Sequence, residues 1–234
     1  MKEQIKCKYC EFENCIVKQG CAGEWLEKIS DNKNRLLYKK GNYIFREGEP
    51  IYGVYFIKSG GIKVITTSLH GREQIVRLAK EGQILGHRGT GRTYYYFNAV
   101  ALKDSEVCFV ENDMFYEACK NSPDFAYSML FFYASELRRA EMRVKFQAQM
   151  NIREKVAMAF IYCYELFGID KETKLLNISL TRNDIADIAG TTAEQVTRQL
   201  RDFENEKLIK KNKRDIIFLN IKGIAEIVRD YKNE

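Results

Sequence analysis

Histidine is scarce in this sequence, since His70 and His87 are the only two among 234 residues. An activated nucleophile needs a base beside it and a third group that orients the base. Neither that arrangement nor a complete phosphate-binding loop can be assembled from the sequence. We therefore do not expect an enzyme, such as a thiol oxidoreductase or a nucleotide hydrolase.

Long uncharged apolar runs are also missing. The longest obvious run covers residues 125–135, whereas a helix needs roughly 20 apolar residues to span a bilayer. Residues 1–4 lead into no signal-like apolar core. These absences predict a soluble, cytoplasmic protein with no membrane partner.

The charge and the cysteine content further restrict the class of protein that this sequence can encode. The net charge of +6 is modest, so affinity for an acidic partner should come from a local basic face. A chain of this length with 45% hydrophobic residues can bury a sizeable core and is expected to form two domains. Seven cysteines are an odd number, and four lie within the first 21 residues. A secreted disulfide framework is therefore a poor explanation.

Residues 180–203 read as two short helices around a tight turn. Ile185, Ile188 and Ala189 form one apolar stripe, and a second stripe follows Gly190. Thr181 can cap the first helix, and Thr191 can cap the second, with Glu194 at capping-box spacing. A helical hairpin would explain these features alone, but the basic segment that follows favours a winged helix-turn-helix on double-stranded DNA.

The second helix presents short or hydrogen-bonding groups suited to base edges. We expect Glu194 and Arg198 to read bases and Thr197 to add a shorter contact, although Glu194 could instead bond to its own backbone. Basic side chains at the hairpin tip would pair with phosphates. The full set of expected DNA contacts is Thr181, Thr191, Thr192, Ala193, Glu194, Thr197, Arg198, Arg201, Lys211, Lys213 and Arg214.

Residues 35–110 show a different sequence pattern, which predicts short β-strands. Glycines punctuate runs rich in Val, Ile, Tyr and Phe, at spacings that suit a compact antiparallel barrel or roll. Residues 39–50, KKGNYIFREGEP, and 54–64, VYFIKSGGIKV, resemble the effector domain of the CRP/FNR (cyclic-AMP-receptor/fumarate-nitrate-regulator) family of bacterial transcription factors. The segments TRNDIA, AEQVTRQL and NEKLI resemble the helix-turn-helix of the same family.

The resemblance implies an α+β fold with an antiparallel β-roll, a long dimerisation helix and a C-terminal winged helix-turn-helix. It places a cysteine-rich segment at 1–21, the β-roll sensor at 22–122, the helix at 123–150 and the DNA-binding domain at 151–234. Such a protein would bind a two-fold symmetric operator as a homodimer and act on RNA polymerase.

Residues 123–149 carry a helical pattern with apolar positions at alternating spacings of four and three, typical of a two-stranded seam. The alternative is a core helix within one domain. The expected dimer contacts are Ala126, Leu130, Tyr133, Leu137, Ala140 and Val144.

Cyclic AMP is not the expected effector. Family members that bind it have a Gly-Glu pair and a later Arg-Ser or Arg-Thr pair, but here His87 follows Gly86, and Phe97 and Asn98 stand in the second place. A phosphodiester would lose its bidentate arginine partner. The sequence leaves two alternatives open, namely that the effector is another anion or that there is no effector. The candidate effector pocket comprises Gly86, His87, Arg88, Arg92, Phe97 and Asn98.

The N-terminal cysteines lie in a short polar segment with little capacity to form a core. Thiolates this close could hold an iron-sulfur cluster or zinc, or they could be incidental. The resemblance places Cys108 at the internal ligand of fumarate-nitrate-type regulators, and Cys15 and Cys21 reproduce a five-residue gap found there. It implies a 4Fe-4S cluster on Cys10, Cys15, Cys21 and Cys108, with Cys7 as the alternative to Cys10. The usual two-residue gap before the last pair is absent, and Phe12 stands in its place.

Overall fold

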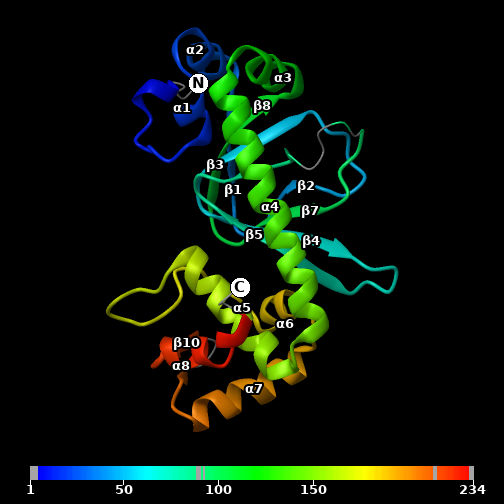
Figure 1. Ribbon diagram of the computed structural model, residues 1–234, viewed down its shortest axis with the longest axis vertical. Helices are drawn as coiled ribbons and strands as arrows, with labels where there is room; N and C mark the ends of the chain where they lie inside the picture. The colour runs from blue at the N-terminus through cyan, green and yellow to red at the C-terminus, as the bar shows by residue number, and fades with distance from the viewer. Residues whose placement is uncertain (1–4, 88–90, 92, 213–214, 232–234) are drawn as a thin grey trace. The chain divides into compact units, whose positions relative to one another are not determined.

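The computed structural model describes residues 5–87, 91, 93–212 and 215–231. The chain divides into two compact units, one of Met1–Thr66 with Leu78–Arg139 and the other of Thr67–Arg77 with Ala140–Glu234. Figure 1 shows the elements of both. Arg88, Arg92, Lys213 and Arg214, which the sequence places in the effector pocket and the wing, lie outside the described residues.

Two four-stranded sheets form the β-roll. One has the order β1-β8-β3-β6 and the other β2-β7-β4-β5. The pairs β1-β8, β2-β7, β3-β6, β3-β8 and β4-β7 are antiparallel. The strands are β1 (Asn34–Tyr38), β2 (Tyr43–Phe45), β3 (Gly53–Ser59), β4 (Gly61–Thr67), β5 (Glu73–Lys80), β6 (Ile84–Leu85), β7 (Asn98–Ala101) and β8 (Ser105–Glu111). The predicted antiparallel roll is confirmed.

Strand β3 is buried on both faces, because its successive side chains pack against different parts of the first unit. Val54 and Phe56 join a core cluster with the neighbouring helices. Tyr55 points to the opposite face, because successive side chains alternate across a strand. There its ring lies 5.7 Å from that of Phe45, which stacks on Tyr95 at 4.0 Å. One face of the sheet therefore meets helices and the other meets aromatic side chains of the roll.

The N-terminal segment contributes to this core, so the prediction that it has little core-forming capacity is wrong. It contains the 3-10 helix η1 (Cys7–Tyr9) and α1 (Ile16–Gly20), followed by α2 (Gly23–Asn32). Val17 and Cys21 are each only 2% exposed. A Cβ on Gly20 would lie 2.9 Å from the Cα of Phe125, so the two backbones approach too closely for a side chain. The segment packs because Val17 and Cys21 are buried in this cluster, with Ile16 packed against it.

Two helices follow β8. They are α3 (Asn112–Asn121) and the long helix α4 (Pro123–Gln149). Phe125 and Met129 on the first turns of α4 are buried in the core cluster that also contains Val17 and Phe115. Cys108 in β8 thus lies only a few residues before α3, the helix that leads into α4.

The second unit contains a winged helix-turn-helix. Its elements are α5 (Ile152–Phe167), α6 (Arg182–Ala189), α7 (Ala193–Asn205), β9 (Ile209–Asn212), β10 (Asp215–Phe218), α8 (Ile221–Glu226) and the 3-10 helix η3 (Arg229–Tyr231). The ring of Phe160 lies 6.5 Å from Phe203 and 5.3 Å from Phe218, which joins α5, α7 and β10 in one core. Asn151 caps α5 with a full capping box, and Gly168 ends it at φ 72°.

Within the described part of the chain, no helix is both long enough and apolar enough to cross a membrane.

Candidate functional site

The first helix of the turn begins and ends where the sequence predicts. The Thr181 hydroxyl accepts from the Asp184 amide, and the Asp184 carboxylate accepts from the Thr181 amide, which completes a capping box. Gly190 ends α6 in the left-handed region at φ 66°, where glycine is the least strained residue.

The cap of the second helix differs by one residue from the prediction. Thr192, not Thr191, is the N-cap of α7, and its side chain accepts from the Gln195 amide. The hydroxyl of Thr191 donates instead to Oε1 of Gln195 at 2.7 Å, and Thr191 is only 9% exposed. The sequence offers two adjacent threonines, and only the extended backbone at Thr192 (ψ 156°) sets its oxygen over the helix end.

The predicted base-reading residues share the exposed side of α7. Glu194, Thr197, Arg198 and Arg201 are exposed, and Ala193 is partly exposed. The opposite side packs into the domain core through Val196, Leu200 and Phe203. The helix therefore offers a polar face with two arginines to a partner.

Two charged residues of the expected interface, Glu194 and Lys211, already have intramolecular partners. The pKa of Glu194 is lowered by hydrogen bonds from its own backbone amide and from the Thr192 hydroxyl. Lys211 in β9 pairs with Glu204 of α7 at 2.7 Å, and its amide donates to the same carboxylate at 2.9 Å. Lys211 thus fixes the hairpin to α7 and must exchange Glu204 for any phosphate.

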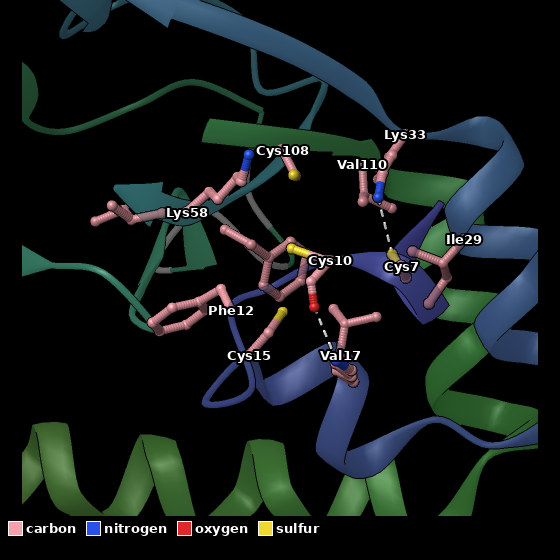
Figure 2. A pocket seen from close by; sticks show the side chains of 13 residues that line it. Cys7, Cys10, Phe12, Cys15, Val17, Ile29, Lys33, Lys58, Cys108 and Val110 are labelled. Atoms are coloured by element: carbon pink, nitrogen blue, oxygen red, sulfur yellow. Dashed lines mark hydrogen bonds between the residues drawn. The ribbon is translucent and has the colours of Figure 1, made fainter. Parts of the chain in front are cut away.

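Four cysteines line a single pocket in the first unit. They are Cys7 on η1, Cys10 just after it, Cys15 just before α1, and Cys108 on β8. Figure 2 shows the side chains of Cys10, Cys15 and Cys108 pointing into the same space. The remaining walls are three lysines and apolar side chains, namely Lys18, Lys33, Lys58, Phe12, Val17, Ile29, Phe56, Ile57 and Val110.

Cys21 is not among these lining residues. It is 2% exposed and belongs to the helical core cluster with Phe125. Burial raises the pKa of Cys21 to about 12, and a hydrogen bond with Ser122 opposes the rise. Cys15 and Cys21 flank the two ends of α1, so the helix separates them. The lining of the pocket therefore includes Cys7, Cys10, Cys15 and Cys108 and does not include Cys21.

Hydrogen bonds to the backbone hold two of the pocket cysteines in place. The Cys7 amide donates to the Ser30 hydroxyl at 2.8 Å, and Lys18 donates to the Cys10 carbonyl at 2.9 Å. Burial raises the pKa of Cys108 to about 11, and the charge of Lys33 acts in the opposite direction. Burial also raises the pKa of Cys15, while the amides of Lys18 and Val17 oppose it.

The donor set fits a thiolate-ligated cluster better than one ion. Within the described ranges, no three or more His, Cys, Asp or Glu side chains come together closely enough to hold a single metal ion. A four-iron cluster instead takes one thiolate at each of four separate corners, which requires sulfurs spread around a space. The pocket supplies four cysteines, which is the number of thiolates that such a cluster takes.

The described residues of the candidate effector pocket contact different parts of the first unit. His87 is 3% exposed, and its ring lies 4.8 Å from Phe132 and 5.6 Å from Tyr133 of α4. Asn98 accepts from the amide of Glu47 at 3.0 Å. Gly86 adopts φ 78° close to the Gly53 carbonyl, and Phe97 is partly exposed. These contacts position loops and α4.

The predicted dimer seam splits between two environments. Leu130, Leu137 and Val144 are 63, 61 and 72% exposed, and Ala140 is also exposed. Ala126 and Tyr133 are partly buried, and the Tyr133 hydroxyl donates to the His87 carbonyl at 2.9 Å. Heptad spacing alone does not distinguish these faces.

Sequence reasoning missed the three pocket lysines and Ser30. They come from α1, β3 and the end of α2, whose spacing from the cysteines carries no motif. No local signal in the sequence would have brought them together.

Two family models match the chain in order. Residues 35–122 match the cyclic nucleotide-binding domain, and residues 154–227 match the Crp-like helix-turn-helix domain. The chain is 24% identical over 226 residues to transcriptional regulatory protein btr of Bordetella pertussis, covering 95% of this chain and 93% of that protein. It is 23% identical over 231 residues to the fumarate and nitrate reduction regulatory protein of Escherichia coli, covering 94% and 91%.

Solved structures share the fold. FixK2 from Bradyrhizobium japonicum matches with a TM-score of 0.74 at 22% identity, over 83% of this chain and 96% of that one. A putative CRP/FNR-family regulator from Eubacterium rectale matches with a TM-score of 0.73 at 22% identity, over 89% and 95%. Together with the two matched family models, these findings show that the chain belongs to the CRP/FNR family of DNA-binding transcription regulators, which are not enzymes.

Proposed function

We propose that this regulator acts as a homodimer and senses oxygen or redox state through a 4Fe-4S cluster. Residues 1–21 and 22–122 would form the sensor, 123–150 the dimer helix and 151–234 the part that binds a two-fold symmetric operator. The observation that carries the proposal is the gathering of Cys7, Cys10, Cys15 and Cys108 around one pocket. The names of relatives support it, since they include anaerobic regulatory protein of Haemophilus influenzae and electron transport regulator A of Shewanella oneidensis.

The ligands we propose are Cys7, Cys10, Cys15 and Cys108, with Cys21 outside the set. When bound, the cluster supplies an oxygen-sensitive bond to each thiolate. This chain's own residues do the rest. The N-terminal segment contributes three thiols and β8 contributes one, so ligation ties the two together.

The route from the pocket to α4 is short. Cys108 precedes α3 by four residues, and α3 shares a core with α1 and the first turns of α4 through Phe115 and Phe125. Releasing the N-terminal segment from Cys108 would loosen the packing of that core. The proposed consequence is a weaker dimer and weaker operator binding, because each recognition helix alone makes only half of the contacts.

The dimer contact we propose lies on the exposed side of α4. Leu130, Leu137 and Val144 recur every seven residues there, and no charged side chain occupies those three positions. Exposed apolar side chains at this period are typical of a two-stranded helical seam. A DNA-bound dimer of this type would also present a surface to RNA polymerase.

The test begins with protein purified without air. We expect visible absorption bands, about four irons and four sulfides per chain as the cluster type requires, and operator binding that falls after exposure to air. Cys163→Ser is the matched control, because Cys163 is 1% exposed in the core of the second unit. Anaerobically reconstituted protein without iron or sulfide would reject the cluster. Equal operator affinity before and after air, with thiols oxidised, would leave a regulator with another effector or none.

A further inference from the structure

Lys33 occupies an unusual position beside the thiol pocket. It ends α2, where its amide donates to the Ile29 carbonyl at 2.9 Å. The residue is only 4% exposed, and its ammonium donates to the sulfur of Cys7 at 3.0 Å. Figure 2 shows this bond reaching from the helix to the sulfur.

Each of the three pocket lysines has a polar contact. Lys18 pairs with Glu13 at 2.5 Å, and Lys58 pairs with Glu106 at 3.2 Å. The contact of Lys33 that bears on the pocket is its bond to the Cys7 sulfur, because that sulfur lines the pocket.

An ammonium–sulfur hydrogen bond is stronger when the sulfur is a thiolate, because the acceptor is then charged. A metal binds the thiolate form. Hydrogen bonds to the sulfurs and nearby charge also set how firmly a cluster is held and its reduction potential. The bond from Lys33 thus favours the loaded pocket over the empty one.

Building on the proposed function, we infer that Lys33 is a positioning residue of the pocket, which orients the Cys7 sulfur and supplies the positive charge that an anionic iron-thiolate group requires. The role does not depend on Lys33 stabilising the fold. Burial of an ammonium group costs desolvation free energy, and Lys33→Met removes that cost from the iron-free protein.

The experiment compares wild type, Lys33→Met and Lys58→Met, each reconstituted without air with ferrous iron and sulfide. Methionine keeps the length of the side chain and removes its charge. We measure the rate of iron loss to a chelator, the midpoint potential of the cluster and the melting temperature of iron-free protein. We expect Lys33→Met to lose iron about 10- to 100-fold faster, the usual effect of removing a group that hydrogen-bonds a metal ligand.

The midpoint potential of Lys33→Met should also become more negative, because the lost positive charge no longer favours the added electron. The iron-free variant should melt no lower than wild type, and Lys58→Met should behave like wild type in every measurement. If iron-free Lys33→Met does melt lower, Lys33→Arg decides, since restored iron retention in that variant supports the role of the charge.

Three results would overturn the inference and leave the cluster proposal intact. They are wild-type iron retention and potential in Lys33→Met, an equal deficit in Lys58→Met, and a destabilised Lys33→Met whose deficit Lys33→Arg does not restore. Wild-type protein that holds no iron would instead reject the proposed cluster itself, and the inference with it.

Discussion

Gly190 approaches the carboxamide of Gln147 so closely that a Cβ on the glycine would lie 2.6 Å from Gln147 Oε1. The glycine also holds φ 66° at the end of α6. Gly190→Ala should therefore cost about 1–2 kcal/mol of folding free energy, through backbone strain and the displaced side chain. Urea unfolding followed by a probe in the second unit measures this cost.

Gly71→Ala is the control for that substitution. Gly71 has φ 75°, but nothing lies within 4 Å of its Cβ position, so it tests the backbone strain alone. An equal cost for the two variants would show that the Gln147 contact contributes nothing.

Arg153 and Glu206 link the start of α5 to the end of α7 by two parallel hydrogen bonds of 2.8 and 2.6 Å. The bonds from Arg153 hold the pKa of Glu206 below its ordinary value of 4.5. A lowered folded-state pKa means that the stabilisation is present above the unfolded value and is lost as pH falls through the folded one. Both side chains are partly exposed, so Glu206→Gln should cost at most about 1 kcal/mol at neutral pH.

The difference between wild type and Glu206→Gln should shrink as the pH falls below about 4.5. Denaturant midpoints measured at pH 7 and at lower pH check this. Glu226→Gln is the matched control, because its pair with Arg229 has both side chains 63% exposed. A loss in Glu206→Gln that does not change with pH would assign the effect to packing.

The elements that follow from the sequence are those with local signals. Thr181, Gly168 and Gly190 mark helix ends through caps that need only neighbouring residues. The roll is predictable for a similar reason, since its β-rich runs end at glycine turns. Local rules fail by one residue at Thr192, where two threonines compete for one cap.

The cysteine pocket could not be predicted in full, because it depends on contacts between residues whose spacing in the sequence follows no motif. Cys15 and Cys21 have a suggestive gap, but α1 lies between them, and Cys21 turns toward Ser122. Lys33 reaches Cys7 from another helix. On α4, the same period places Tyr133 against its own unit and leaves Leu137 exposed, because a heptad identifies a stripe and not its partner.

Leu137→Glu tests the proposed dimer seam. Leu137 is 61% exposed, so a monomer should tolerate the change, whereas a two-fold seam would face two carboxylates against each other. We expect monomers in sedimentation and weak binding to half-sites. Leu37→Glu is the control, since Leu37 is 71% exposed and belongs to β1 rather than to α4. An undisturbed dimer in Leu137→Glu would move the interface elsewhere.

Arg198→Ala tests base reading by α7. Arg198 is exposed on the face opposite the buried Val196. Its loss should cost about 1–3 kcal/mol on the operator and much less on random DNA. Equal losses on both, in titrations at one salt concentration, would assign Arg198 to phosphate contact.

Glu194→Gln separates two possible roles of Glu194, which are capping the start of α7 and contacting a base. The carboxylate already accepts from its own amide and from Thr192. If it serves only the cap, the variant should keep its preference for operator over random DNA and lose a little stability. A changed base preference would instead show that Glu194 leaves the cap to contact a base.

Cys15→Ser and Cys21→Ser separate the ligand set seen in the pocket from the one that sequence spacing suggests. Cys15 lines the pocket, so its loss should abolish visible colour and iron binding in protein prepared without air, as should Cys108→Ser. Cys21 is a buried member of the core cluster and does not line the pocket. Cys21→Ser should keep its iron and cost about 1–2 kcal/mol of stability, because a buried thiol is exchanged for a hydroxyl. Iron content and melting temperature, measured on all three variants, decide between the two sets, and a colourless Cys21→Ser that melts like wild type would restore Cys21 as a ligand.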